Sequence, residues 1–416
     1  MGLIRRPGRC DMMRRREVLK TALVAGMGGS AMTAPAALAP STAAVSAANN
    51  AFGLALLRAQ DSSKNAFLSP TSIAAALGMT ACGAQGETRA QMAKVLGFSA
   101  GDPSVDPVWA ELVKSLRADK PGRQVSLANR LFGQKGYGFL PGFTGRLSSA
   151  FDAPLEEVDF GVPEAAKVRI NAWVASRTRD MIKDLIPSGV LTPLTRLVLA
   201  NAIHFKGEWL HPFSKSRTVD QPFEIAPGNS KALPMMSQTG QFVVREDEEA
   251  VSLAMPCKGD DRGVVFILPR KRHNLTQLES SLTAESLERL VSSQAVPQKV
   301  DLRVPRFEVD TRFGLNESLK KMGMARAFEP GRAEFEPMNG GKEPLHIDAV
   351  LHKAVLKVDE QGAEAAAATG VIVATKAIPQ PVRRFVVDQP FLVAIHDKAT
   401  GGLLFLGRVR EPASKA

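Results

Sequence analysis

The spacing of apolar residues predicts helices along the first half of the chain. Four segments have apolar side chains at helical spacing or the start and stop signals of a helix; they are residues 42–59, 65–80, 86–97 and 170–185. Pro70 suits a first helical turn, because the N–H that proline lacks would have no partner there. Gly97 suits a helix end, and 170–185 is the strongest amphipathic segment of the chain.

Short apolar runs predict strands along the second half. They are rich in Val, Leu, Ile and Phe and are bounded by Gly, Pro or Asp; the runs are residues 197–205, 264–268, 300–304, 354–358, 391–395 and 403–406. The run 354–358 alternates apolar and polar residues, which fits a half-buried strand, and one further helix is expected at 313–321. Helices followed by strands, without β-α-β alternation, indicate an α+β protein with antiparallel or mixed sheets.

The composition is that of a globular protein, with 44% hydrophobic and 23% charged residues. The net charge of +11 falls to +6 without residues 1–39, because these hold seven Lys and Arg against two acidic residues. The remaining charges of both signs are interspersed, which indicates a solvated surface. We therefore expect no nucleic-acid partner.

Residues 1–39 are expected to be an export signal. The basic run RRREVLK, Arg14–Lys20, precedes an apolar stretch rich in Gly and Ala, which is the order found in signal peptides. The consecutive arginines are similar to the twin-arginine signal of bacterial export. Cleavage is expected after Ala39, or as late as Ala47, and no later apolar run approaches the roughly 18 residues that span a membrane. We expect a single-domain mature chain that is periplasmic or extracellular.

Sequence motifs of metal sites and of common enzymes are missing. The chain has no C-x-x-C, H-E-x-x-H, G-x-S-x-G, P-loop or post-strand G-x-G-x-x-G, so we expect no metal and no cofactor. Cys82 and Cys257 are expected to be small core residues. Ser69 or Ser72 could act with His352 as nucleophile and base, which keeps an exported serine hydrolase as a remote alternative. A serine at a helix start, however, usually caps the helix.

Residues 360–381, EQGAEAAAATGVIVATKAIPQP, combine small residues, one lysine and two prolines. Small side chains would let such a segment slide between two strands of a sheet. Lys376 stands in a run that is expected to be exposed, and Pro379 and Pro381 stiffen the end of the segment. Alanine and glutamate also favour helices, so a short helix and an ordinary linker are alternative interpretations.

Several segments, in order along the chain, resemble the serpin family of serine protease inhibitors. They include NAFLSPTSIAAAL from Asn65, NAIHFKGEW from Asn201, LHKAVLKVDEQGAEAAAAT from Leu351 and DQPFLVAI from Asp388. The resemblance implies about nine helices and three β-sheets in one domain, expected to span residues 48–414. It also implies an exposed reactive-centre loop at residues 360–381.

The resemblance further implies a mechanism of inhibition. A target protease cuts the reactive-centre loop, forms an acyl-enzyme, and is trapped as the cleaved loop inserts into the large central sheet. Insertion adds backbone hydrogen bonds and buries apolar surface, so the intact protein is expected to be metastable. The implied partner is a serine protease in a covalent complex, and the inhibitor itself is expected to be a monomer.

Family spacing assigns roles within the loop. Glu360 would begin the hinge of the loop, and small residues after it would form the rest; they are Gly362, Ala363, Ala365, Ala366, Ala367, Ala368 and Thr369. On insertion, alternate residues from Ala363 onward would point inward, and Glu364 would fall on the outward side. The cleaved bond is expected between Lys376 and Ala377, and a lysine there suits a trypsin-like protease. A slip of one residue in either direction would change this assignment.

Five residues outside the loop match positions that the family uses during insertion. Ser69, Ser72, Asn201 and His352 match a buried polar cluster below the point where the sheet opens, and would control strand separation through hydrogen bonds. Trp209 matches the residue beneath the point where the loop enters. Small hinge residues favour inhibition; the alternative is a non-inhibitory serpin-fold protein with a binding or chaperone-like role.

Overall fold

The computed structural model describes residues 42–98, 122–259, 262–292, 295–363, 382–398 and 400–413. These residues belong to one compact unit, Ala39–Ala416. The leader expected at residues 1–39 and most of the loop expected at 360–381 lie outside the described residues. Within the described ranges, no helix is long and apolar enough to cross a membrane.

Nine α-helices lie within the described part of the chain. Their bounds are α1 Thr42–Arg58, α2 Pro70–Ala81, α3 Gly86–Leu96, α5 Pro141–Phe151, α6 Pro163–Arg177, α7 Leu275–Ser281, α8 Ala284–Val291, α9 Asn316–Lys321 and α10 Glu336–Asn339. Helix α2 is buried along its whole length and is capped by Ser69, whose side chain accepts a hydrogen bond from the Ser72 N–H. Helix α3 ends at Gly97, where φ is 75° and glycine avoids strain. The start signal at Pro70 and the predicted helix 86–97 are confirmed, whereas residues 66–68 of the predicted segment 65–80 form strand β1.

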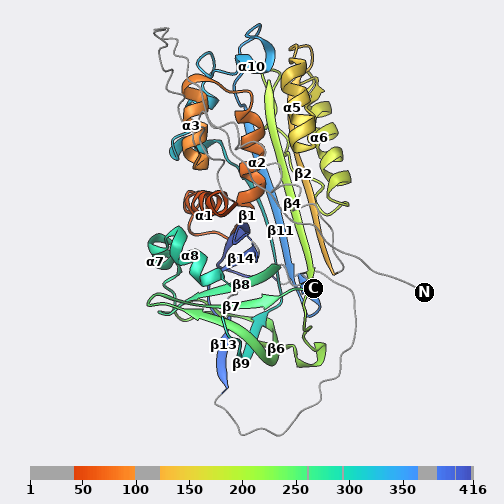
Figure 1. Cartoon of the computed structure of the whole chain (residues 1–416). Helices are drawn as coiled ribbons and strands as arrows, with labels where there is room; N and C mark the ends of the chain where they lie inside the picture. Colours follow the sequence, from red (N-terminus) through yellow and green to blue (C-terminus); the bar gives the residue numbers. More distant parts are fainter. Residues whose placement is uncertain are drawn as a thin grey trace, which may run out of the picture. The chain divides into compact units, whose positions relative to one another are not determined.

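Six strands form the central sheet. Their order is β10-β11-β4-β2-β3, and β12 pairs with β4 outside this path. The bounds are β10 Phe307–Gly314, β11 Ala349–Val358, β4 Leu197–Glu208, β2 Arg123–Gln134, β3 Glu156–Val158 and β12 Gly362–Ala363. Strands β11 and β4 run parallel, whereas β4 is antiparallel to β2 and to β12. Figure 1 shows β11, β4 and β2 as long neighbouring strands.

Strand β4 is packed on both faces. Its odd-numbered apolar side chains pack in two hydrophobic clusters on one face, and the even-numbered ones pack in a third cluster that includes α6. The residues are Leu197 and Leu199 in the first cluster, Ile203 and Phe205 in the second, and Val198, Ala200 and Ala202 in the third. Strand β11 is likewise buried at every residue except Lys357. The half-buried strand predicted from the alternation at 354–358 was therefore wrong, because helix α6 and its neighbours cover the second face.

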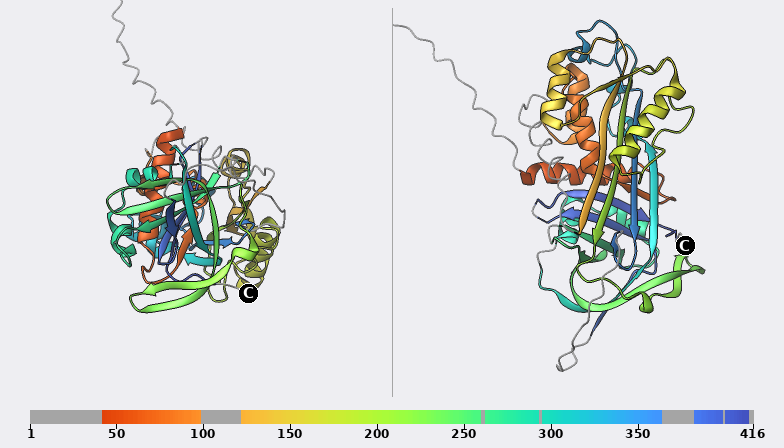
Figure 2. Two further views of the ribbon diagram at one scale, coloured as in Figure 1. Left: turned by 90° about the horizontal axis from the view of Figure 1, so that it is seen from below. Right: turned by 90° about the vertical axis from the view of Figure 1, so that its right-hand side faces the viewer.

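The remaining strands form two further sheets that share strand β6, Asn229–Glu246. This strand pairs with β9 over Met235–Phe242 and with β7 over Val243–Glu246. The other bounds are β1 Ala66–Leu68, β5 Val219–Ala226, β7 Ala250–Pro256, β8 Arg262–Pro269, β9 Gln298–Pro305, β13 Arg383–Val386, β14 Phe391–Asp397 and β15 Leu403–Val409. In the right-hand view of Figure 2, β14 and β15 run across the long central strands. The predicted α+β fold with three sheets is confirmed.

Some predicted elements have different bounds. Helix α6 begins at Pro163 and ends at Arg177, because Arg179 and Asp180 adopt left-handed φ values of 53° and 62°. The later apolar residues of the predicted helix 170–185 still pack in the α6 cluster. The helix expected at 313–321 begins only at Asn316, since Phe313 belongs to strand β10.

Strand β2, Arg123–Gln134, contradicts the predicted order of helices first and strands later. It pairs with β4, which lies some seventy residues further along the chain. The local sequence pattern therefore did not predict this strand. The two cysteines of this part of the chain, Cys82 and Cys257, are buried as expected, and no disulfide joins them.

Candidate functional site

Strands β11 and β4 stop pairing before either strand ends. The last pair of their parallel ladder is Val355 with His204, yet β11 continues to Val358 and β4 to Glu208. We call this point the fork. An edge without a partner strand offers its N–H and C=O groups to another segment, so β4 is open to a new neighbour beyond the fork.

The two-residue strand β12 occupies that edge of β4. The chain leaves β11, turns over residues 359–361, and pairs Gly362 with Glu208 and Ala363 with Gly207 in the antiparallel sense. Strand β12 also contacts β11, so a new strand begins between the two. A β-carbon on Gly362 would lie 2.2 Å from the carbonyl oxygen of Gly207, and glycine is therefore required for this approach.

Hydrogen bonds of Asp359 hold the turn before β12. Its carboxylate accepts from the N–H groups of Gln361 and Gly362 at 2.9 and 3.2 Å, and its own N–H donates to the Gly362 carbonyl at 2.9 Å. This is a common use of aspartate in turns. The sequence analysis missed Asp359, although an aspartate directly after a predicted strand is a turn signal.

Trp209 connects the end of β4 to the same turn. Its indole is fully buried, and its Nε1–H donates to the carbonyl oxygen of Asp359 at 2.9 Å. Its backbone N–H donates to the Gln361 carbonyl at 3.0 Å. Trp209 thus lies beside the start of β12, and its predicted role where the loop enters stays a prediction.

Glu360 is a nearly buried acid within this turn, with 5% of its surface exposed. Its carboxylate accepts a hydrogen bond from the Thr218 hydroxyl at 2.8 Å and lies 3.8 Å from the Arg306 guanidinium. Its carbonyl accepts from the Phe213 N–H at 2.8 Å. These three partners were missed, because they lie in connecting segments that are distant in sequence. They fix the first residue of the predicted hinge.

The four residues of the predicted polar cluster come together below the fork. Ser69 and Ser72 lie at the start of α2, and Asn201 of β4 pairs in register with His352 of β11. The Ser69 N–H donates to His352 Nε2 at 3.1 Å, and Asn201 Nδ2 donates to the Ser72 carbonyl at 2.9 Å and to its hydroxyl. All four residues are buried. The cluster therefore joins α2 to both strands on the two sides of the fork.

His352 is neutral, and its tautomer follows from its partners. Because the Ser69 N–H can only donate, Nε2 carries the lone pair and the proton is on Nδ1, which bonds the Asn201 Oδ1. Complete burial lowers the pKa of His352 to about 3. The imidazole thus donates one hydrogen bond and accepts another, and carries no charge at neutral pH.

A fifth member of this cluster, Asn129, was missed by the sequence analysis. It lies on β2, opposite Asn201, and its Nδ2 donates to the Ser72 carbonyl at 3.1 Å. Asn129 becomes a signal only once β2 is recognised as a buried strand, because buried amides need partners. With Asn129, the start of α2 is bonded to three adjacent strands.

The same geometry argues against a serine hydrolase. The Ser69 hydroxyl donates to the Leu404 carbonyl at 2.6 Å, and the His352 ring is bonded by the Ser69 backbone instead. A nucleophilic serine would need its hydroxyl beside the imidazole and access to substrate. Here Ser69, Ser72 and His352 are fully buried.

Comparison with known proteins agrees with this arrangement. The family described as Serpin (serine protease inhibitor) matches residues 47–412. The chain belongs to the serpin family. Among curated relatives of this serpin, Serpin B6 of Bos taurus is 36% identical over 378 residues, which cover 89% of this chain and 100% of the relative. Antithrombin-III of Mus musculus is 37% identical over 366 residues, which cover 86% of this chain and 78% of the relative.

Solved structures of other serpins are also similar. Human thyroxine-binding globulin complexed with thyroxine has a TM-score of 0.82 at 30% identity, over 90% of this chain and 100% of that chain. Uncleaved ovalbumin has a TM-score of 0.80 at 27% identity, over 89% of this chain and 100% of that chain.

The predicted serpin resemblance is therefore confirmed, whereas the predicted loop chemistry stays a prediction. Glu360, Gly362 and Ala363 are described, but the hinge residues 365–369 and the bond between Lys376 and Ala377 lie outside the described residues. The relatives are named both as a leukocyte elastase inhibitor and as a thyroxine-binding globulin. Inhibition by this serpin has to be argued from its own residues.

Proposed function

We propose that this serpin inhibits a trypsin-like serine protease as a suicide substrate, by inserting its cleaved loop between β11 and β4. The observation that carries the proposal is strand β12, which already pairs with β4 in the antiparallel sense beyond the fork. A cleaved loop would extend a strand that exists as β11 and β4 separate. Each added residue would gain ladder hydrogen bonds and bury apolar surface.

The register of β12 supports this extension. Continued one residue for one along β4, it would set Ala365 opposite Phe205, Ala367 opposite Ile203 and Thr369 opposite Asn201. Directly opposed residues point to the same side of an antiparallel pair, and these β4 positions face the core or the polar cluster. The loop offers small side chains at each of them.

The single charge of the hinge also falls where it is tolerated. The same register would set Glu364 opposite Lys206, which is half-buried on the other face of the sheet. Opposite charges across a strand pair stabilise the pair. An unpaired glutamate on the core side would instead oppose insertion.

The target class follows from the expected cleavage site. Lys376 before Ala377 suits a protease with a carboxylate in its specificity pocket, and the product would be a covalent complex of protease and serpin. A monomer is sufficient for this mechanism. We also propose export, on the basis of the basic and apolar leader at residues 1–39.

Incubation with trypsin, followed by a denaturing gel, tests the proposal. We expect a stable band at the summed mass of the two proteins. Lys376→Glu should abolish this band, whereas the same substitution at the exposed Lys342 should leave it unchanged. Cleavage without a complex would contradict inhibition.

Such an outcome would favour the second candidate, a non-inhibitory serpin with a binding role. This candidate is supported by the similarity to thyroxine-binding globulin, whose solved structure contains bound thyroxine. The two candidates differ in whether the cut loop remains linked to the protease.

A further inference from the structure

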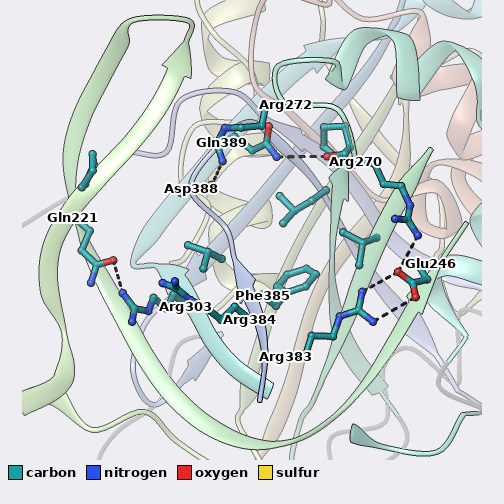
Figure 3. Close-up of a pocket in the computed structure, with 15 residues that line it drawn as sticks. Gln221, Glu246, Arg270, Arg272, Arg303, Arg383, Arg384, Phe385, Asp388 and Gln389 are labelled. Carbon is teal, nitrogen blue, oxygen red and sulfur yellow. Dashed lines mark hydrogen bonds and ion pairs between the residues drawn. The ribbon is translucent and has the colours of Figure 1, made fainter. Parts of the chain in front are cut away.

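A cavity of about 640 Å³ lies beside strand β13, in a region that the proposed mechanism does not use. Five arginines contribute to its lining; they are Arg270, Arg272, Arg303, Arg383 and Arg384. They come from β13, from β9 and from the segment after β8. Figure 3 shows Arg303 and Arg384 on one side of Phe385, and Arg270 and Arg383 on the other.

The wall formed by Arg270 and Arg383 has one carboxylate for two guanidinium groups. Glu246 lies 2.9 Å from Arg383 and 2.9 Å from Arg270. Arg383 first, and Arg270 as well, hold the pKa of Glu246 below its usual range. One positive charge of this wall is therefore left without a matching carboxylate.

The wall formed by Arg303 and Arg384 is even less satisfied. Asp301 lies 3.5 Å from Arg303 and 3.9 Å from Arg384. The Arg303 guanidinium donates one hydrogen bond, to Gln221 at 3.2 Å, and its buried Nε has no acceptor within the described residues. Within the described part of the chain, the Arg384 guanidinium has only the 3.9 Å ion pair with Asp301, although it carries five N–H groups.

Arg272 at the remaining side of the cavity differs from these two walls. It is bonded to Asp388 and to Glu224, each at 3.0 Å, so this side has one carboxylate more than it has guanidinium groups and offers no positive charge to a ligand. The two walls are separated by apolar side chains, among them Phe385 and Leu268, which expose 3% and 5% of their surface. The cavity thus has two positive walls on either side of an apolar floor.

We propose that this cavity binds an organic dianion, with one sulfate, phosphate or carboxylate group at each positive wall and a ring over Phe385. Arginine pairs well with such groups because its planar fork donates two parallel hydrogen bonds. A ligand with a single anionic group would satisfy only one wall. The inference does not depend on whether the serpin inhibits a protease.

Such a ligand would hold strand β13 in its sheet. In the described part of the chain β13 pairs with β9 alone, along four residues. Both flanking arginines, Arg383 and Arg384, belong to β13, whereas Arg270 and Arg303 belong to the neighbouring elements. A dianion therefore bridges β13 to both sides, and slows its local opening.

Titration calorimetry with naphthalene-1,5-disulfonate tests the site, because this probe has two anionic groups on opposite sides of a flat ring. We expect it to bind at least tenfold more tightly than naphthalene-1-sulfonate at the same ionic strength. Arg384→Ala and, separately, Arg303→Ala should each weaken disulfonate binding at least tenfold. The control is Arg332→Ala, since Arg332 and Arg384 have equal side-chain exposure of 66%; it should change binding less than twofold.

Hydrogen exchange of the β13 amides gives a second measurement. Exchange at residues 383–386 should slow at least threefold when the disulfonate is bound to the intact serpin. Equal affinity for the two sulfonates, or equal loss of binding in Arg332→Ala and Arg384→Ala, would overturn the dianion site. Binding without slower exchange would overturn the bridging role of the ligand.

Discussion

His352 links the stability of this protein to pH, because its imidazole is buried without a charged partner. Burial lowers its pKa to about 3, whereas an exposed histidine in the unfolded chain has a pKa near 6.5. The unfolded chain therefore binds the extra proton between these values. Stability is fully present above about pH 6.5 and is lost as the pH falls toward about 3.

We predict that the free energy of unfolding falls on acidification from pH 7 to pH 5, by about 2 kcal/mol for His352. His396, whose pKa burial lowers to about 4, adds a loss of the same sign. Urea unfolding at several pH values measures the slope. His352→Gln should reduce the slope, and the same change at the exposed His211 should leave it as it is. An unchanged slope in His352→Gln would show that another group titrates.

The polar residues below the fork were named from the family motif, and their role in strand separation stays a prediction. Ser69, Ser72, Asn201 and His352 were named from the sequence, and the structure brings them into one hydrogen-bonded group. Asn129 was missed, because its partner on α2 is set by a strand pairing that no neighbouring residue encodes.

Strand β12 exists because its first residue has no side chain. A β-carbon at Gly362 would contact a backbone oxygen at 2.2 Å, and a backbone atom of β4 moves only with its strand. The turn bonds of Asp359 and Trp209 then hold β12 in position. Adding a methyl group at Gly362 should therefore displace the whole of strand β12.

We predict that Gly362→Ala separates β12 from β4 and shifts the outcome of the trypsin reaction from complex toward cleaved serpin. The number of serpin molecules consumed for each trypsin molecule inhibited should rise severalfold, as measured by gel densitometry. Gly142→Ala is the matched control, because a β-carbon there would have no atom of the described chain within 4 Å. Equal consumption in the two variants would mean that β12 does not start insertion.

Elements with local start and stop signals were predicted with nearly correct ends, as α2 and α3 illustrate. Elements whose conformation or extent depends on residues distant in sequence were not predicted correctly. Strand β2 becomes a strand by pairing with β4, and α6 stops at Arg177 although apolar side chains continue to Leu185. The burial of β11 on both faces likewise depends on elements that cover it.

The whole molecule has a central sheet that is one strand short of the state we propose for its product. A complete strand in that position would have neighbours on both sides, at roughly 1 kcal/mol of net stabilisation for each hydrogen bond. The intact form would then persist because opening the sheet is slow. The three-sheet architecture itself was predictable from the family motifs, whereas the fork was not, since it is a detail of strand register.

We predict that cutting the loop with a protease that does not form a complex raises the melting temperature by at least about 10 °C. A gain of roughly 8 kcal/mol suffices for such a shift in a chain of this size. Differential scanning calorimetry before and after limited proteolysis makes the comparison. An unchanged melting temperature would show that the cut loop stays outside the sheet.

The fork determines the end from which strands β11 and β4 separate. Parallel strands that already diverge at one end separate from that end, one residue pair at a time, because each step breaks only the hydrogen bonds of the outermost pair. Starting from Val355, three pairs precede His352 with Asn201. At that pair, separation of the strands also requires several hydrogen bonds to the start of α2 to break together. Separation of the first three residue pairs therefore meets little resistance, whereas separation of the fourth pair is resisted by the polar cluster. Thermal opening near the fork need not spread through the sheet.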